Sequence, residues 1–109
     1  MRTIPTVHQL RLSGKPVEIT HRRNYYKYDS KTGKKHILLL SYEEYKQSHS
    51  DYYLDAKGGA TYVTIYTDAS RTENFSVIAV CSKFDPYNRK TGVRIGVGKA
   101  FSKMSSIKN

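Results

Sequence analysis

Two uncharged, alternating segments joined by a short polar stretch constrain the fold of this chain more than any other feature. Residues 61–67 (TYVTIYT) and 74–82 (NFSVIAVCS) are rich in β-branched and aromatic residues, which favour strands. Residues 68–73 are polar and suit a connecting loop. The pattern predicts a β-hairpin over 61–82 with Val63 and Ile65 buried on one face.

The other face of the first of these strands carries Tyr62, Thr64 and Tyr66. Two interpretations fit this face. It is either an open platform on which unpaired bases stack, or a core face under a C-terminal helix. We expect the core face.

The first half of the chain predicts two further hairpins and one helix. The hairpins pair 7–12 with 17–20 across a turn at 13–16, and 24–29 with 36–40 across a loop at 30–35. Ile37 to Leu40 is apolar on both faces, which predicts a central strand. Ser41 followed by Glu44 is a capping-box signature, and it predicts a short helix from Tyr42 to about His49.

The stretch 84–104 (FDPYNRKTGVRIGVGKAFSKM) fits two templates. As a helix it places five apolar residues on one stripe, namely Val93, Val97, Ala100, Phe101 and Met104. As a strand it alternates apolar residues with Arg94, Gly96 and Gly98. The two glycines suit neither element, but the length of the run exceeds that of a usual strand and favours a helix. The whole chain therefore predicts one α+β domain over 1–109: a mostly antiparallel sheet of five to six strands, a short middle helix and a C-terminal helix packed on the sheet.

Charge narrows the class of partner. The chain has 19 Lys and Arg against nine Asp and Glu, a net charge of +10. Residues 1–40 carry +7, residues 41–82 carry −3 and residues 83–109 carry +6. A balance of this kind favours polyanions, although solubility alone is an alternative explanation. The two basic ends form one positive surface only if the fold brings them together.

Three stretches carry the candidate contacts to an anion. Residues 21–28 (HRRNYYKY) interleave cations with tyrosines, a mixture in which cations hold phosphates and rings stack on unpaired bases. An edge strand protected from aggregation by its cations is the competing interpretation. With the loop before the second strand and the C-terminal stretch, the candidate residues are Arg22, Arg23, Tyr25, Lys34, Lys35, Tyr87, Asn88, Arg89, Lys90, Arg94 and Lys99.

Catalytic and metal signatures are weak. The histidines at 8, 21, 36 and 49 have no zinc-like spacing to one another or to Cys81, so we expect no metal and no cofactor. His21 or His36 as an acid/base group keeps a small nuclease open as an alternative. Cys81, the single cysteine, lies in an apolar run and predicts a structural thiol in a cytoplasmic protein. No apolar run is long enough to predict a membrane span.

Residues 75–104 (FSVIAVCSKFDPYNRKTGVRIGVGKAFSKM) resemble the C-terminal pattern of small phage-encoded proteins. In those proteins a strand leads through an aromatic-Asn-Arg-Lys turn into a Gly/Arg-rich closing helix. The chain departs from the pattern at Val97 and Lys99, where alanine and arginine are more usual. The resemblance implies a role in host takeover or anti-defence inside the host cell, including inhibition of the anti-CRISPR kind.

Three function classes follow. The first is a non-enzymatic protein that binds nucleic acid or a nucleotide and inhibits a host defence. The second is a protein–protein inhibitor whose basic surface plugs an acidic groove of a host enzyme. The third is the small nuclease. A steep dependence of binding on salt separates the first class from the second, and turnover of an oligonucleotide identifies the third.

Overall fold

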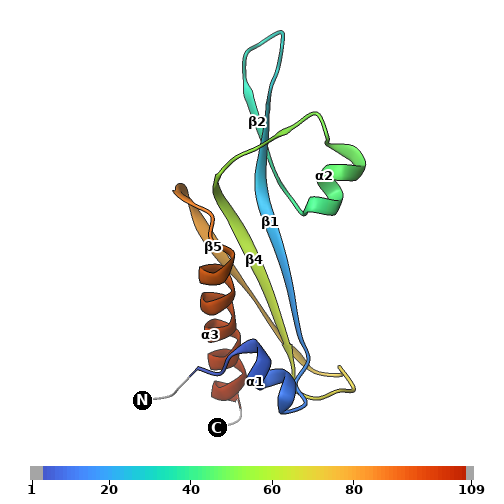
Figure 1. Ribbon diagram of the computed structural model, residues 1–109, viewed down its shortest axis with the longest axis vertical. Coiled ribbons are helices and arrows are strands. Elements are labelled where there is room, and N and C mark those ends of the chain that lie inside the picture. Colours follow the sequence, from blue (N-terminus) through green and yellow to red (C-terminus); the bar gives the residue numbers. More distant parts are fainter. Residues whose placement is uncertain (1–3, 108–109) are drawn as a thin grey trace. The chain divides into compact units, whose positions relative to one another are not determined.

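The computed structural model describes residues 4–107 and shows the α+β fold that the sequence predicts (Figure 1). Five strands form an antiparallel sheet in the order β2-β1-β4-β5, and β3 pairs with β1. The elements in chain order are α1 (Val7–Leu12), β1 (Val17–Tyr28), β2 (Lys35–Leu40), α2 (Tyr42–Ser48), β3 (Tyr53–Leu54), β4 (Lys57–Tyr66), β5 (Asn74–Pro86) and α3 (Arg89–Ile107).

The chain divides into two compact units, and each is described by itself below. Unit 1 comprises residues 4–20, 61–79 and 88–107 of the described chain, and it holds both terminal helices, α1 and α3. Unit 2 comprises residues 21–60 and 80–87, and it holds β2, α2 and β3. The long strands β1, β4 and β5 contribute residues to both units.

The core of unit 1 lies between α3 and one face of the sheet. Val63 and Ile65 of β4 are completely buried, as the hairpin prediction required, and Phe75 of β5 is buried beside them. The apolar stripe of α3 packs against this face through Val97, Ala100 and Met104, with Val93 and Phe101 partly buried at its margins. The helical interpretation of the C-terminal stretch is therefore confirmed.

Small residues let α3 approach β4 closely. Gly92 lies over Thr61, and a Cβ built on it would overlap the threonine side chain. Gly96 lies over Val63, where an added Cβ would stand 2.5 Å from Cγ2. With Ala100 one further turn along, these residues form a ridge of small side chains at four-residue spacing that faces the sheet.

The predicted face assignment of β4 is half right. Thr61, Val63 and Ile65 face α3, so the opposite face with Tyr62, Thr64 and Tyr66 is not the core under that helix. Its side chains are half-buried, and two of them form hydrogen bonds with residues of the neighbouring strands. The Tyr66 hydroxyl donates to Glu18, and Thr64 shares a hydrogen bond of 2.7 Å with Ser76 of β5.

Residues 7–12 form a helix and not the predicted strand, so the first predicted hairpin is wrong. Thr6 and Gln9 make a complete capping box: the Thr6 side chain accepts from the Gln9 amide, and the Gln9 side chain accepts from the Thr6 amide. Leu10 then enters the core. A helical turn satisfies these backbone groups locally and still buries Leu10, while Leu12 stays exposed.

The hairpin of β1 and β2 in unit 2 is confirmed in its pairing, with Tyr26 opposite Ile37 and Tyr28 opposite Lys35. The prediction that Ile37 to Leu40 forms a central strand is wrong, because β2 is the last strand of the sheet order. Its two apolar faces also differ in burial. Leu40 is buried, whereas Ile37 remains 55% exposed on the other face.

Helix α2 follows the prediction almost to the residue. Ser41 and Glu44 form the expected capping box, and the helix ends at Ser48 with His49 as its C-cap. None of its residues is fully buried. The helix is attached to the sheet by Tyr45, whose ring stacks on Tyr25 of β1 at a centroid distance of 4.5 Å.

Candidate functional site

Helix α3 begins with cations immediately after its cap. The Asn88 side-chain oxygen accepts a hydrogen bond from the Thr91 amide at 3.0 Å, and its carbonyl accepts from the Gly92 amide. Arg89 and Lys90 therefore occupy the first turn, which contains no acidic residue. Since a helix N-terminus carries partial positive charge, this turn concentrates positive potential where proteins usually place Asp or Glu.

All five cations of α3 project into solvent: Arg89, Lys90, Arg94, Lys99 and Lys103. Within residues 4–107 none of them forms an ion pair, a cation–π contact or a side-chain hydrogen bond. Their charge is therefore not neutralised by this part of the chain.

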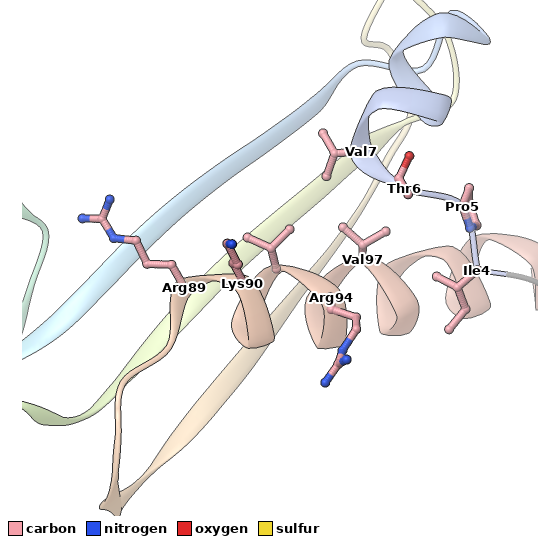
Figure 2. Close-up of a pocket in the computed structure, with 9 residues that line it drawn as sticks. Ile4, Pro5, Thr6, Val7, Arg89, Lys90, Arg94 and Val97 are labelled. Atoms are coloured by element: carbon pink, nitrogen blue, oxygen red, sulfur yellow. The ribbon is translucent and has the colours of Figure 1, made fainter.

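A groove of about 580 Å³ runs between the segment 4–7 and the first half of α3 (Figure 2). Its floor is aliphatic, with Val7 and Val97 facing each other, and Ile4 lies at one end. Arg89 and Arg94 contribute the apolar stems of their side chains, while their guanidinium groups point away from the two valines. With Lys90 they form a cationic rim around an apolar floor.

The candidate arginines of unit 2 are engaged within the unit. Arg22 forms an ion pair of 2.7 Å with Glu44 of α2. Arg23 is half-buried, places its guanidinium 4.6 Å from the centre of the Tyr87 ring and donates to the carbonyl of Asp55. Both side chains hold parts of unit 2 together, which limits what they can give to an external phosphate.

The candidate tyrosines are also structural. Tyr25 is only 4% exposed and lies under α2. Tyr87 is half-buried against Gly59, where an added Cβ would come within 2.8 Å of the ring. The Tyr87 hydroxyl donates to the carbonyl of Ala60 and lies 2.6 Å from Nδ1 of His21. Neither ring offers an open face to a base.

The fold thus groups the predicted site residues into two sets. Unit 1 brings Arg89, Lys90, Arg94 and Lys99 together on α3, with Asn88 as the cap before it. Unit 2 holds Arg22, Arg23, Tyr25 and Tyr87 internally, and leaves Lys34 and Lys35 exposed at the β1–β2 connection.

Three tyrosines of unit 2 are absent from the predicted site residues: the exposed Tyr28 and Tyr53, and the half-buried Tyr26. Tyr26 and Tyr28 lie in the stretch 21–28 that the sequence singled out, on the strand face opposite Tyr25. The alternation of β1 was the available signal. Once Tyr25 is assigned to the buried face of β1, alternation places Tyr26 and Tyr28 on the opposite face.

The histidines considered for catalysis, His21 and His36, contact different residues. His21 bonds Tyr87, and Nε2 of His36 lies 4.0 Å from Oδ2 of Asp29. Across residues 4–107 no three His, Cys, Asp or Glu side chains gather as a metal-binding cluster. Within the same part of the chain, no helix combines the length and the apolar character needed to cross a membrane.

Comparison of the chain with protein-family models, with curated proteins and with solved structures found no match.

Proposed function

We propose that this chain is a small, basic, non-enzymatic protein that binds nucleic acid, or a nucleotide, through the cations of α3. The observation that carries the proposal is the absence of any partner for Arg89, Lys90, Arg94, Lys99 and Lys103 in the described chain. Each phosphate that such a cation neutralises releases a condensed counterion, and this release drives binding. The N-terminal turn of α3 adds its own positive potential.

The proposed biological role follows from the resemblance of residues 75–104 to small phage-encoded proteins. Binding would serve to inhibit a host defence or another host process, as in inhibition of the anti-CRISPR kind. Expression of the protein in a bacterium should then raise the plating efficiency of a phage that a nucleic-acid-dependent defence restricts. A variant that no longer binds nucleic acid should lose this effect.

The test of binding compares two variants that remove the same charge. Replacing Arg89, Lys90 and Arg94 by alanine should flatten the log–log dependence of the association constant on salt by about 2 to 3 units, because three phosphate contacts are lost. The control replaces Lys27, Lys46 and Arg71, which have Asp51, the Tyr42 ring and Glu18 as partners. This control should keep the slope close to that of the parent protein.

Fluorescence anisotropy of a labelled oligonucleotide measures both slopes when the protein is titrated at salt concentrations between about 50 and 300 mM. Equal slopes for the two triple variants would mean that the cations of α3 form only a solvated surface. Absence of binding at low salt would reject the function itself. Release of labelled fragments during the titration would instead favour the nuclease.

A second candidate function is supported by the groove of unit 1. Its aliphatic floor offers nothing to the polar edges of a base, but it suits apolar side chains from a protein segment whose acidic residues meet the cationic rim. An inhibitor of this kind would hold a segment of the host enzyme in its own groove, instead of plugging an acidic groove of that enzyme. Purification from cells separates the two functions: a high 260/280 nm absorbance ratio supports nucleic acid, and a co-purifying acidic protein supports the inhibitor.

A further inference from the structure

One face of the sheet in unit 2 gathers tyrosines. Tyr26 and Tyr28 lie two residues apart on β1, and Tyr53 of β3 pairs with Tyr26. The ring of Tyr26 contacts both neighbours, with centroid distances of 5.8 Å to Tyr28 and 5.8 Å to Tyr53. Ile37 pairs with Tyr26 on β2 and therefore shares the face. We call these residues, with Leu39, the tyrosine face.

The tyrosine face is open, in contrast to the opposite face of the same strands. Tyr28 is 58% exposed and Tyr53 is 65% exposed. On the other face, Tyr25 is buried under the Tyr45 ring of α2. A tyrosine ring left in water exposes a large apolar surface, and Tyr28 and Tyr53 together with the exposed Ile37 exceed the scattered apolar residues that soluble proteins normally show.

Strand alternation also sorts the charges between the two faces. Lys27 and His36 point to the face opposite the tyrosines, and they engage Asp51 and Asp29 there. Within unit 2, no acidic residue of β1 (21–28), β2 or β3 lies on the tyrosine face. Lys35 lies on this face opposite Tyr28, and its ammonium stands 4.8 Å from the centre of the Tyr26 ring. The face is therefore aromatic, free of acids and positively charged at its margin.

We propose that the tyrosine face stacks the unpaired bases of single-stranded nucleic acid, with Lys34 and Lys35 holding the adjacent phosphates. This inference rests on the proposed function and specifies its ligand. Every base has an aromatic face, so stacking on tyrosine tolerates any sequence but requires bases that are not already paired. A duplex presents only its backbone, which the tyrosines cannot use.

A second copy of the chain is the competing occupant of an open, aromatic sheet face. The lysines at the β1–β2 connection oppose that arrangement, because two copies meeting there would bring like charges together. The same lysines attract phosphates. Charge complementarity therefore selects nucleic acid.

The test uses the full chain, a labelled oligothymidylate and a mixed-sequence duplex of the same length. Tyr28→Ala and Tyr53→Ala should each weaken binding of the oligothymidylate about five- to a hundred-fold, and should leave binding of the duplex unchanged. Tyr42→Ala is the matched control, since Tyr42 is 60% exposed but lies on α2. Tyr28→Phe keeps the ring and should bind like the parent protein.

A spectroscopic readout reports stacking directly. An oligonucleotide that contains 2-aminopurine should lose fluorescence when it binds the parent protein, because stacking on a ring quenches the base. It should keep its fluorescence when it binds the Tyr28→Ala, Tyr53→Ala double variant. Circular dichroism of each variant confirms that the fold is retained.

Distinct outcomes separate this inference from the proposed function. If the parent protein binds the duplex as tightly as the oligothymidylate, or if Tyr42→Ala weakens binding as much as Tyr28→Ala, the tyrosine face does not stack bases. The change of salt slope in the α3 variant would still support the proposed function in that case. Loss of a dimer in the double variant, with binding unchanged, would assign the face to self-association and overturn the inference. Failure of both ligands to bind would reject both proposals.

Discussion

The two units use similar amounts of positive charge in different ways. In unit 2, six of nine Lys and Arg side chains have an acidic, aromatic or carbonyl partner. In unit 1, two of the eight in residues 4–107 do, namely Arg11 and Arg71. Unit 2 uses its cations to join strands, loop and helix, whereas the cations of α3 hold nothing in place.

This contrast shows why net charge alone does not locate a binding surface. The basic N-terminal third and the basic C-terminal stretch look alike in sequence. After folding, most described cations of the N-terminal third have an acid, a ring or a carbonyl as partner, whereas those of the C-terminal stretch are presented along a single helix. What remains attractive to a polyanion is the charge without an internal partner, together with aromatic surface free of acids.

The largest effect that would sharpen the contrast is expected at Tyr25. Tyr25→Ala removes a buried ring from under α2 and should lower the free energy of unfolding by about 3 to 5 kcal/mol. Tyr28→Ala, on the exposed face, should change it by less than about 1 kcal/mol. Urea unfolding followed by circular dichroism measures both. A stable Tyr25→Ala variant with weakened oligonucleotide binding would reverse the roles assigned to the two tyrosines.

A smaller effect is expected in unit 1, where two helical glycines have different surroundings. Gly→Ala normally stabilises a helix by about 1 kcal/mol. At Gly96 the new methyl group would press on the fully buried Val63, so Gly96→Ala should instead destabilise by about 1 to 3 kcal/mol. At Gly98 the nearest atom is the end of the Ile4 side chain, 3.2 Å away, which can move.

Gly98→Ala should therefore raise the melting temperature, and Gly96→Ala should lower it. Differential scanning calorimetry on both variants gives the comparison. Stabilisation by both substitutions would show that α3 does not pack on β4 as closely as described. The cations of α3 would then lack the rigid support assigned to them.

The smallest expected effect concerns an ion pair of unit 2. The hydrogen bond and charge of the Lys27 ammonium hold the pKa of the Asp51 carboxyl below its ordinary value of about 3.9. A carboxyl whose folded pKa is lowered stabilises the fold above its unfolded pKa, and that contribution is lost as the pH falls through the folded pKa. Lys27→Met should raise the pKa of Asp51 and remove this part of the acid sensitivity.

Carboxyl carbon shifts recorded by NMR between about pH 2 and 6 follow the titration of Asp51. Asp68, which is held by the hydroxyl and amide of Ser70, serves as the internal control and should titrate identically in both proteins. An unchanged pKa of Asp51 in Lys27→Met would show that the cations of unit 2 are less engaged than the contrast requires.

Local signals carried much of the fold. The alternation of residues 61–67, the capping box at Ser41 and the apolar stripe of α3 each depend on neighbours in sequence, and each prediction is confirmed. The errors arose where the local pattern was short or fitted both a helix and a strand. Residues 7–12 contain too few apolar positions to separate helix from strand, although Thr6 and Gln9 form the same kind of capping box as Ser41 and Glu44.

Other features depend on tertiary structure and had no sequence signal of their own. The edge position of β2 follows from the order of strands, which the apolar run at Ile37 to Leu40 does not encode. The glycines of α3 looked like a weakness of the helix, and only the position of Thr61 and Val63 beneath them explains their use. Which candidate cations are engaged became visible only when distant acids and rings came together.

The sorting of side chains along β1 has a consequence for how this protein can diverge. Because faces alternate residue by residue, deletion of a single residue within β1 would exchange the environments of Tyr25 and Tyr26 and of every neighbour towards one end of the strand. Point substitutions change one position, but a one-residue length change would move Lys27 to the open tyrosine face and expose the ring that supports α2. Length variation among descendants of this chain should therefore collect in the 30–34 loop, while β1 keeps a constant number of residues.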